Sequence, residues 1–187
     1  MARNPASDAG VAAPDTSSLI TLLPYERQDQ EQTQWCWAAV AASVVKYYDA
    51  QTPWRQCSIV NAEFRRQDCC AAGSGADCNN PNGLAGPLAR VMCLYQWAIG
   101  TSSSYDVVRG EIANERPLCL RIEWAGGGGH FAAIIGCLII SGVEHVVLAD
   151  PFFGYRQLSL ADLMVKYPGT DEAGKWTDSY FTRLVTS

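Results

Sequence analysis

Cys36 is the residue of this chain best placed for nucleophilic chemistry. It opens a stretch in which apolar residues recur with helical spacing, at Trp37, Val40, Ala41, Val44 and Tyr48. The first turn of a helix carries unpaired N–H groups and the positive end of the helix dipole, which favour a thiolate over a thiol. A cysteine between two tryptophans can also be a small buried hydrophobe, the commoner role of an unpaired cysteine. The sequence therefore predicts a helix from Trp35 to Tyr48 with a candidate nucleophile at its start.

A cysteine nucleophile needs an imidazole that takes its proton and returns it to the leaving group. The chain contains two histidines, His130 and His145. His145 lies inside a valine-rich strand pattern, where strand pairing or solvent exposure is the ordinary explanation. His130 follows four consecutive glycines and opens a predicted strand. The glycines either let a substrate backbone come close or simply connect two strands. We expect His130 to be the general base.

A third group should orient that imidazole, and Asp150 is the candidate. A turn at 141–142 predicts a hairpin in which paired positions sum to about 283, so that His130 faces residue 153. At roughly 3.3 Å per residue, one bulge or a slightly different turn brings Asp150 within reach of His130. Pro151 ends the strand and leaves the carboxylate free to turn. Taken alone, an Asp-Pro pair is more simply a strand-ending turn.

Gln30 lies six residues before Cys36 and is the candidate oxyanion donor. Its side-chain amide and the N–H of Cys36 together provide two donors for a tetrahedral intermediate. Three other glutamines crowd the same stretch, at positions 28, 32 and 34, so that spacing alone does not choose among them.

Helical patterns dominate the first part of the chain and strand patterns the second. Besides the helix at Cys36, helices are predicted over Cys57 to Arg66, Leu88 to Trp97 and Arg109 to Glu115. Beyond Arg116 the hydrophobic period changes to two, which predicts strands at Leu118 to Trp124, His130 to Ile139, Glu144 to Ala149 and Tyr180 to Val185. Helices followed by an antiparallel sheet indicate an α+β fold.

These motifs, in this order, resemble papain-like cysteine proteases. The resemblance rests on Gln30, on 35–39 (Trp-Cys-Trp-Ala-Ala), on 129–131 (Gly-His-Phe) and on 149–151 (Ala-Asp-Pro), and it runs from about Gln28 to Phe181. The branches that look most similar are the bacterial plant-pathogen effector proteases and the bacteriocin-processing peptidases. Segments at 56–60, 69–70, 78–79 and 174–176 also look like the effector-type branch.

The resemblance implies a fold and a set of roles. The fold would be papain-like, with an N-terminal helical half packed against a C-terminal antiparallel sheet and the active site in the cleft between them. Cys36, His130 and Asp150 would form the catalytic triad, with an Asp where papain has an Asn, and Gln30 would line the oxyanion hole. No cofactor is implied, and the partner would be a protein or peptide substrate, together with a cognate inhibitor or immunity protein.

Four further cysteines, Cys57, Cys69, Cys70 and Cys78, cluster within 22 positions. No pair has the two-residue spacing of a zinc knuckle and no histidine is near, so we expect no metal site. Disulfides are the alternative if the protein works outside a reducing compartment, and three pairings of the four are open. The remaining three cysteines, at positions 93, 119 and 137, fit core positions of helices and strands.

Composition restricts the class of protein and its partners. Of 187 residues, 48% are hydrophobic and 18% charged, which excludes disorder for most of the chain. The net charge of −5 and the absence of a basic cluster argue against a nucleic-acid partner or an anionic membrane surface. No secretory signal or membrane span is legible, so we expect the bacterial cytoplasm or a specialised export route. Residues 1–20 are predicted to be a disordered tail and 21–187 the protease domain.

Three functions use these residues differently. The first is peptide-bond hydrolysis, by an effector or toxin acting on a target protein or by an enzyme that processes leader peptides. The second is acyl or amide-group transfer, or deamidation, by the same triad. The third is a peptide-binding domain with a vestigial site, and the full set of Gln30, Cys36, His130 and Asp150 counts against it.

Overall fold

The computed structural model describes residues 20–167 and 173–185. The predicted tail therefore lies outside the described residues, except for Ile20 at its end. The helices are α1 (Cys36–Tyr48), α2 (Gln56–Phe64), α3 (Ala85–Arg90), α4 (Tyr105–Ala113) and α5 (Leu160–Val165). The strands are β1 (Thr21–Leu22), β2 (Leu94–Ala98), β3 (Leu118–Trp124), β4 (Gly129–Ile140), β5 (Val143–Asp150), β6 (Gly154–Ser159) and β7 (Gly174–Thr182). Helices α1, α2 and α3 precede most of the strands, so the α+β class is confirmed.

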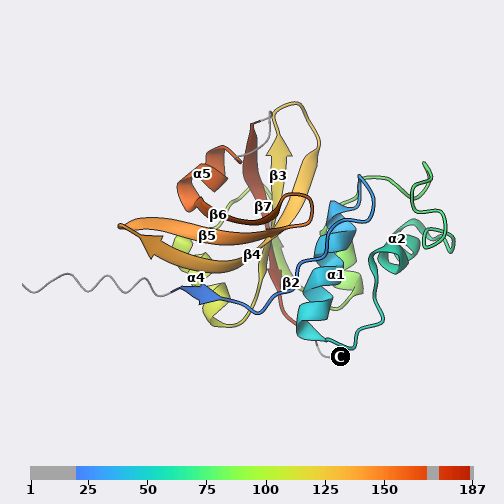
Figure 1. The fold of residues 1–187 in the computed structure, drawn as a ribbon, viewed down its shortest axis with the longest axis horizontal. Helices are drawn as coiled ribbons and strands as arrows, with labels where there is room; N and C mark the ends of the chain where they lie inside the picture. The colour runs from blue at the N-terminus through green and yellow to red at the C-terminus, as the bar shows by residue number, and fades with distance from the viewer. Residues whose placement is uncertain (1–19, 168–172, 186–187) are drawn as a thin grey trace, which may run out of the picture.

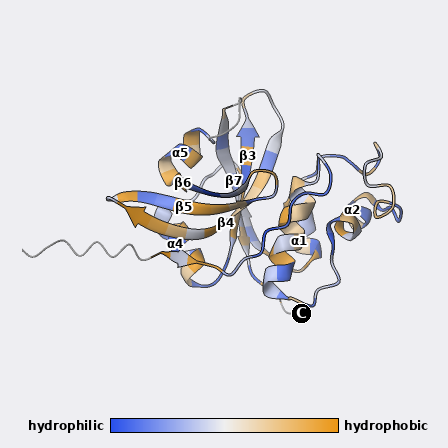
Figure 2. Cartoon of the chain, in the orientation of Figure 1, coloured by the Kyte–Doolittle hydropathy of each residue, from blue (hydrophilic) through white to orange (hydrophobic). Residues whose placement is uncertain are grey.

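The strands form one antiparallel sheet in the order β2-β7-β3-β4-β5-β6, with β1 added to β4. Figure 1 shows α1 and α2 on one side of the molecule and the long strands β4 and β5 on the other. Hydrophobic residues run along β4 and β5 (Figure 2), and α1 packs against β4. The helical half and the sheet half therefore share one hydrophobic core.

Helix α1 is buried on all sides through most of its length. Every residue from Cys36 to Val45 is buried. A helix that is hydrophobic all round belongs in the interior, and its alanines let neighbouring elements approach closely. The helix starts one residue later than predicted, and its first residue is Cys36.

The helix predicted from Leu88 to Trp97 is wrong in its second half. Helix α3 ends at Arg90, and Met92 adopts a left-handed backbone with φ of 58°. The chain then continues as β2, which pairs with β7. The backbone N–H and C=O groups of this stretch are hydrogen-bonded to β7 in the sheet, and this tertiary pairing overrides a weak helical pattern.

The other predicted elements differ mainly at their bounds. The helix expected from Arg109 to Glu115 begins earlier, at Tyr105, after Ser104 caps it by accepting a hydrogen bond from Val107 N. The last strand also begins earlier than predicted, at Gly174, and β7 lies between β2 and β3. Strand β6 and helix α5 have no counterpart in the sequence-based prediction.

Candidate active site

Cys36 is the first residue of α1 and faces the sheet half of the molecule. It is a free thiol with a relative exposure of 9%. The residue before it, Trp35, provides no side-chain cap for the helix. The N–H groups of the first turn have no acceptor within the helix, so the sulfur lies beside unpaired backbone donors.

His130, the second residue of β4, contacts both Cys36 and Asp150. Its Nε2 lies 2.8 Å from Asp150 Oδ2, which leaves Nδ1 for the thiol. Burial alone would lower the pKa of His130. Hydrogen bonds to Asp150 and to Cys36, with the charges of both groups, outweigh burial and raise the pKa to about 9. At neutral pH the imidazole is therefore protonated, and it lies between Asp150 and Cys36.

A β-bulge at Ile135 moves His130 toward Asp150. Near the turn, the residue numbers of paired positions in β4 and β5 add up to 283, as in Ile140↔Val143. Beyond Ile135 the sum becomes 282, as in Ala133↔Ala149. The predicted register is therefore confirmed, and of the two expected alternatives, a bulge or a slightly different turn, the structure contains the bulge. The bulge shifts the register by one residue, so that Asp150, next after Ala149, lies nearer to His130 along the hairpin.

Asp150 is fully buried and accepts four hydrogen bonds. Its Oδ1 accepts from the backbone N–H groups of Phe152 and Phe153, each at 2.8 Å. Its Oδ2 accepts from His130 and from the Tyr167 hydroxyl, the latter at 2.6 Å. Burial alone would raise the pKa of Asp150, but the hydrogen bond and charge of His130, followed by the bond from Tyr167, lower it below its usual value. The carboxylate is thus ionised and fixed in orientation.

Aromatic rings enclose the pair formed by His130 and Asp150. The Trp124 ring stacks on His130, with centroids 6.1 Å apart and an interplanar angle of 24°. Phe153 meets the imidazole edge-on at 5.8 Å. Tyr167 packs against both Trp124 and Phe153. Water is largely excluded from the His130–Asp150 bond, which strengthens it.

Gln30 lies on the loop that leads into α1. Its Nε2 donates to the carbonyls of Gln32 and Thr33, both at 2.9 Å, and its backbone N–H donates to Pro151 O at 3.0 Å. Gln30 thus stays close to the turn after Asp150. The amide is thus bonded to its own loop, and its role in an oxyanion hole remains a prediction.

The other glutamines of this loop have separate backbone anchors. Gln28 N donates to Ser43 Oγ and Gln34 N donates to Asn79 Oδ1. Gln56, buried at 1% exposure, donates to Asp29 O at 2.8 Å and accepts from Glu31 N at 3.0 Å. A buried amide on α2 thus holds the loop on either side of Gln30.

The cysteine cluster forms two disulfides, Cys57–Cys70 and Cys69–Cys78. The end of this cluster is bonded to the residues on either side of Cys36: Trp35 Nε1 donates to Cys78 O at 2.8 Å and Trp37 Nε1 donates to Asn80 O at 3.1 Å. The disulfide loop therefore supports the start of α1.

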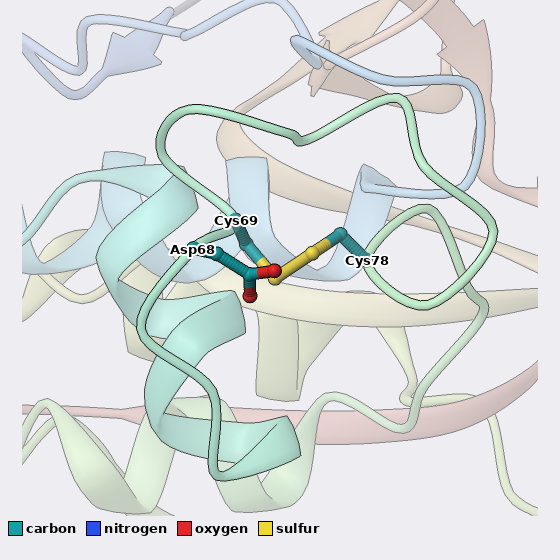
Figure 3. Close-up of side chains that lie close together, drawn as sticks. All are labelled: Asp68, Cys69 and Cys78. Carbon is teal, nitrogen blue, oxygen red and sulfur yellow. A yellow bond between two sulfur atoms is a disulfide. The ribbon is translucent and has the colours of Figure 1, made fainter.

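Asp68, Cys69 and Cys78 bring three potential ligand atoms within 4.8 Å of one another. Figure 3 shows the carboxylate beside a sulfur–sulfur bond, so neither sulfur can act as a thiolate ligand. Asp68 also pairs with Arg66. This group does not fit a metal.

The sequence prediction missed three residues around the site, Tyr167, Trp124 and Gln56. Tyr167 follows α5, which was not predicted, and is 17 positions from its partner. Trp124 could have been noticed as the last residue of a predicted strand just before the glycines. Gln56 carries no signal, because its role depends on a loop that is distant in sequence.

The fold and these side chains define a papain-like cysteine peptidase. A family model described as "Papain-like cysteine protease AvrRpt2" matches residues 18–167, and the chain belongs to this family. No curated protein matches the chain.

Two solved structures show the same fold at low identity. One is digestive procathepsin L 3 of the Tenebrio molitor larval midgut, with 12% identity, a TM-score of 0.54, and coverage of 87% of this chain and 67% of that one. The other comes from a study of antibody cross-reactivity between the mite allergens Blo t 1 and Der p 1, with 13% identity, a TM-score of 0.50, and coverage of 97% and 75%. No helix in the described ranges is long and apolar enough to cross a membrane.

Proposed function

We propose that the chain hydrolyses peptide bonds with Cys36 as nucleophile, His130 as acid and base, Asp150 as the group that orients His130, and Gln30 as an oxyanion donor. The observation that carries this proposal is the position of His130, with Nε2 on Asp150 and its other nitrogen left for the Cys36 thiol. A buried carboxylate, an imidazole and a thiol at a helix start are the groups that acyl transfer to sulfur requires.

The reaction proceeds in two stages. The Cys36 thiolate attacks the peptide carbonyl, and the N–H of Cys36 with the amide of Gln30 stabilises the tetrahedral oxyanion, each donor contributing about 3–4 kcal/mol. His130 then gives its proton to the departing amine, which leaves a thioester on Cys36. In the second stage His130 takes a proton from water, the hydroxide adds to the thioester, and the carboxylate product leaves as Cys36 regains its starting state.

The Gln30 amide must serve this role from its place in the loop. Its Nε2 carries two hydrogens and lies 2.9 Å from both the Gln32 and Thr33 carbonyls. A small rotation that keeps one of these bonds would turn the second N–H toward an oxyanion. The Cys36 N–H is already available, because it starts the helix.

The enzyme acts as a bacterial effector on a target protein, outside the reducing cytosol. Membership of the AvrRpt2 family supports this role. The two disulfides support it as well, because such bonds persist in oxidising environments.

The test compares Cys36→Ala with Cys93→Ala. Cys93 is also a buried free cysteine, but it lies at the start of β2 and takes no part in the site. We expect wild type and Cys93→Ala to cleave a degenerate peptide library and to react with iodoacetamide at Cys36. We expect Cys36→Ala to lose both activities. Cleavage by Cys36→Ala would overturn the proposal.

The transfer reaction is separated from hydrolysis in the same assay. Casein is incubated with the enzyme and a labelled primary amine, and peptide fragments and incorporated label are measured. Fragments without label support a peptidase. Incorporation or deamidation without fragments would contradict hydrolysis and assign the triad to group transfer.

A further inference from the structure

Asp150 has a second side-chain partner besides His130. The hydroxyl of Tyr167 donates to Oδ2 of Asp150 at 2.6 Å, the same oxygen that His130 Nε2 contacts at 2.8 Å. The other carboxylate oxygen is already held by two backbone N–H groups. Tyr167 and His130 therefore share one acceptor atom.

Tyr167 is itself held rigidly. Its exposure is 1%, and its ring packs against Trp124 and Phe153, the two rings that contact His130. The Arg156 guanidinium lies 5.7 Å from the centre of the Tyr167 ring. The Tyr167 backbone N–H donates to Gly174 O at 2.6 Å, which joins it to β7.

The hydroxyl acts as a donor and stays protonated. Burial, and then the charge of Asp150, raise the pKa of Tyr167 well above its usual value. An ionised carboxylate offers lone pairs only, so the proton between the two oxygens belongs to Tyr167.

On the proposed function, the geometry points to Tyr167 as a positioning residue that sets the basicity of His130 through Asp150. A donor at Oδ2 draws charge away from the atom that faces the imidazole. With Tyr167 in place, Asp150 holds the imidazolium less tightly, and His130 can release its proton to the leaving amine more readily. The hydroxyl also fixes the direction in which the carboxylate points.

The charged groups that act on this pair of side chains can be named for the described residues, 20–167 and 173–185. The titratable groups that act on His130 are Asp150 and Cys36, and those that act on Tyr167 are Asp150 and Arg156. The rings of Trp124 and Phe153, which also contact the imidazole, carry no charge.

The test is Tyr167→Phe, with Tyr48→Phe as its control. Tyr48→Phe also removes a partly buried hydrogen bond, the one between the Tyr48 hydroxyl and Thr182 Oγ1 at 2.9 Å. Tyr48 lies at the end of α1 opposite Cys36. The readouts are the NMR titration of the His130 ring nitrogens and the pH profile of kcat/KM. We expect Tyr167→Phe to raise the titration midpoint of His130 by about half a pH unit or more, because the carboxylate charge is less shared. The alkaline limb of kcat/KM should move by the same amount, with kcat lowered several-fold and KM unchanged.

A second variant decides the matter if Tyr167→Phe does not fold. Incorporation of 3-fluorotyrosine at position 167 keeps the shape of the ring and makes the hydroxyl a stronger donor. The His130 midpoint should then fall. Opposite shifts in the two variants, with none in Tyr48→Phe, support the assignment; an unchanged midpoint in the fluorinated protein overturns it.

The NMR titration needs no turnover, so the two proposals can fail separately. If the wild-type protein cleaves no peptide but the titration midpoint of His130 still shifts in the variants, only the proposal of peptide hydrolysis is rejected. If the wild-type protein is active but the titration midpoint of His130 is the same in the Tyr167 variants, only the proposed role of Tyr167 is rejected.

Discussion

The backbone N–H of Gln30 donates to the carbonyl of Pro151 at 3.0 Å. Gln30 stands on the loop before Cys36, and Pro151 follows Asp150, whose carboxylate is hydrogen-bonded to His130. One hydrogen bond thus joins the loop of the helical half to the turn of the sheet half. The two walls of the site are linked through backbone, independently of the side chains that would perform the reaction.

Asp150→Asn should reduce kcat/KM strongly. The amide keeps an oxygen for the N–H groups of Phe152 and Phe153, but turns an NH2 toward His130 and Tyr167, where an acceptor is needed. By analogy with other triads the loss should be about 10²- to 10⁴-fold. Steady-state kinetics check this result. Asp106→Asn, on the exposed face of α4, is the control and should retain full activity.

Gln56→Leu should loosen the loop around Gln30. It removes a donor to Asp29 O and an acceptor for Glu31 N, and leaves both backbone groups without these partners. The expected cost is about 1–3 kcal/mol of unfolding free energy. Since Gln30, the proposed oxyanion donor, lies on the same loop, kcat should fall as well. Urea unfolding and kinetics measure both, against Gln157→Leu on the exposed part of β6. A normal kcat in a destabilised Gln56→Leu protein would show that the loop tolerates the change.

Removal of the Cys69–Cys78 disulfide should affect activity more than removal of Cys57–Cys70. Serine pairs at either position should lower the unfolding free energy, by about 2–4 kcal/mol in the usual range. The carbonyl of Cys78, however, accepts from Trp35, the residue next to the nucleophile. The measurements are denaturant unfolding and kcat/KM under identical buffer. Equal kcat/KM losses in the two double variants would argue against a special role for the Trp35 contact.

Activity should fall as the pH rises through about 9. On the proposed mechanism, His130 there loses the proton that it gives to the leaving amine. The profile of kcat/KM between pH 6 and 10.5 tests this expectation. Asp150→Asn should move the alkaline limb to lower pH, since it removes the charge that favours the imidazolium.

The same proton contributes to stability. The folded-state pKa of His130 is raised, so its contribution is fully present below about pH 6.5 and is lost as the pH rises through about 9. Urea unfolding of wild type and His130→Gln at pH 6 and pH 10 isolates this contribution. The difference in unfolding free energy between the two proteins should shrink at the higher pH; a constant difference would contradict the raised pKa.

Local patterns predicted the elements that hold the candidate site. The helix at Cys36 has strong periodicity, and the turn at 141–142 set the register of β4 and β5. The position of the bulge was not predictable, because it depends on β1: Leu23 N donates to Ile135 O at 2.8 Å. The same limit applies to Tyr167 and to the pairing of the cysteines. Each depends on contacts between segments whose mutual position exists only in the folded chain.

The bulge at Ile135 also decides which residue of β4 meets the thiol. Side chains alternate between the two faces of a strand, and one extra residue inverts the alternation beyond it. Deletion of Ile135 would turn His130 to the opposite face and present Gly129 or Phe131 to Cys36 instead. The bulge, five residues away from His130, therefore determines which face of β4 carries this histidine, the proposed general base.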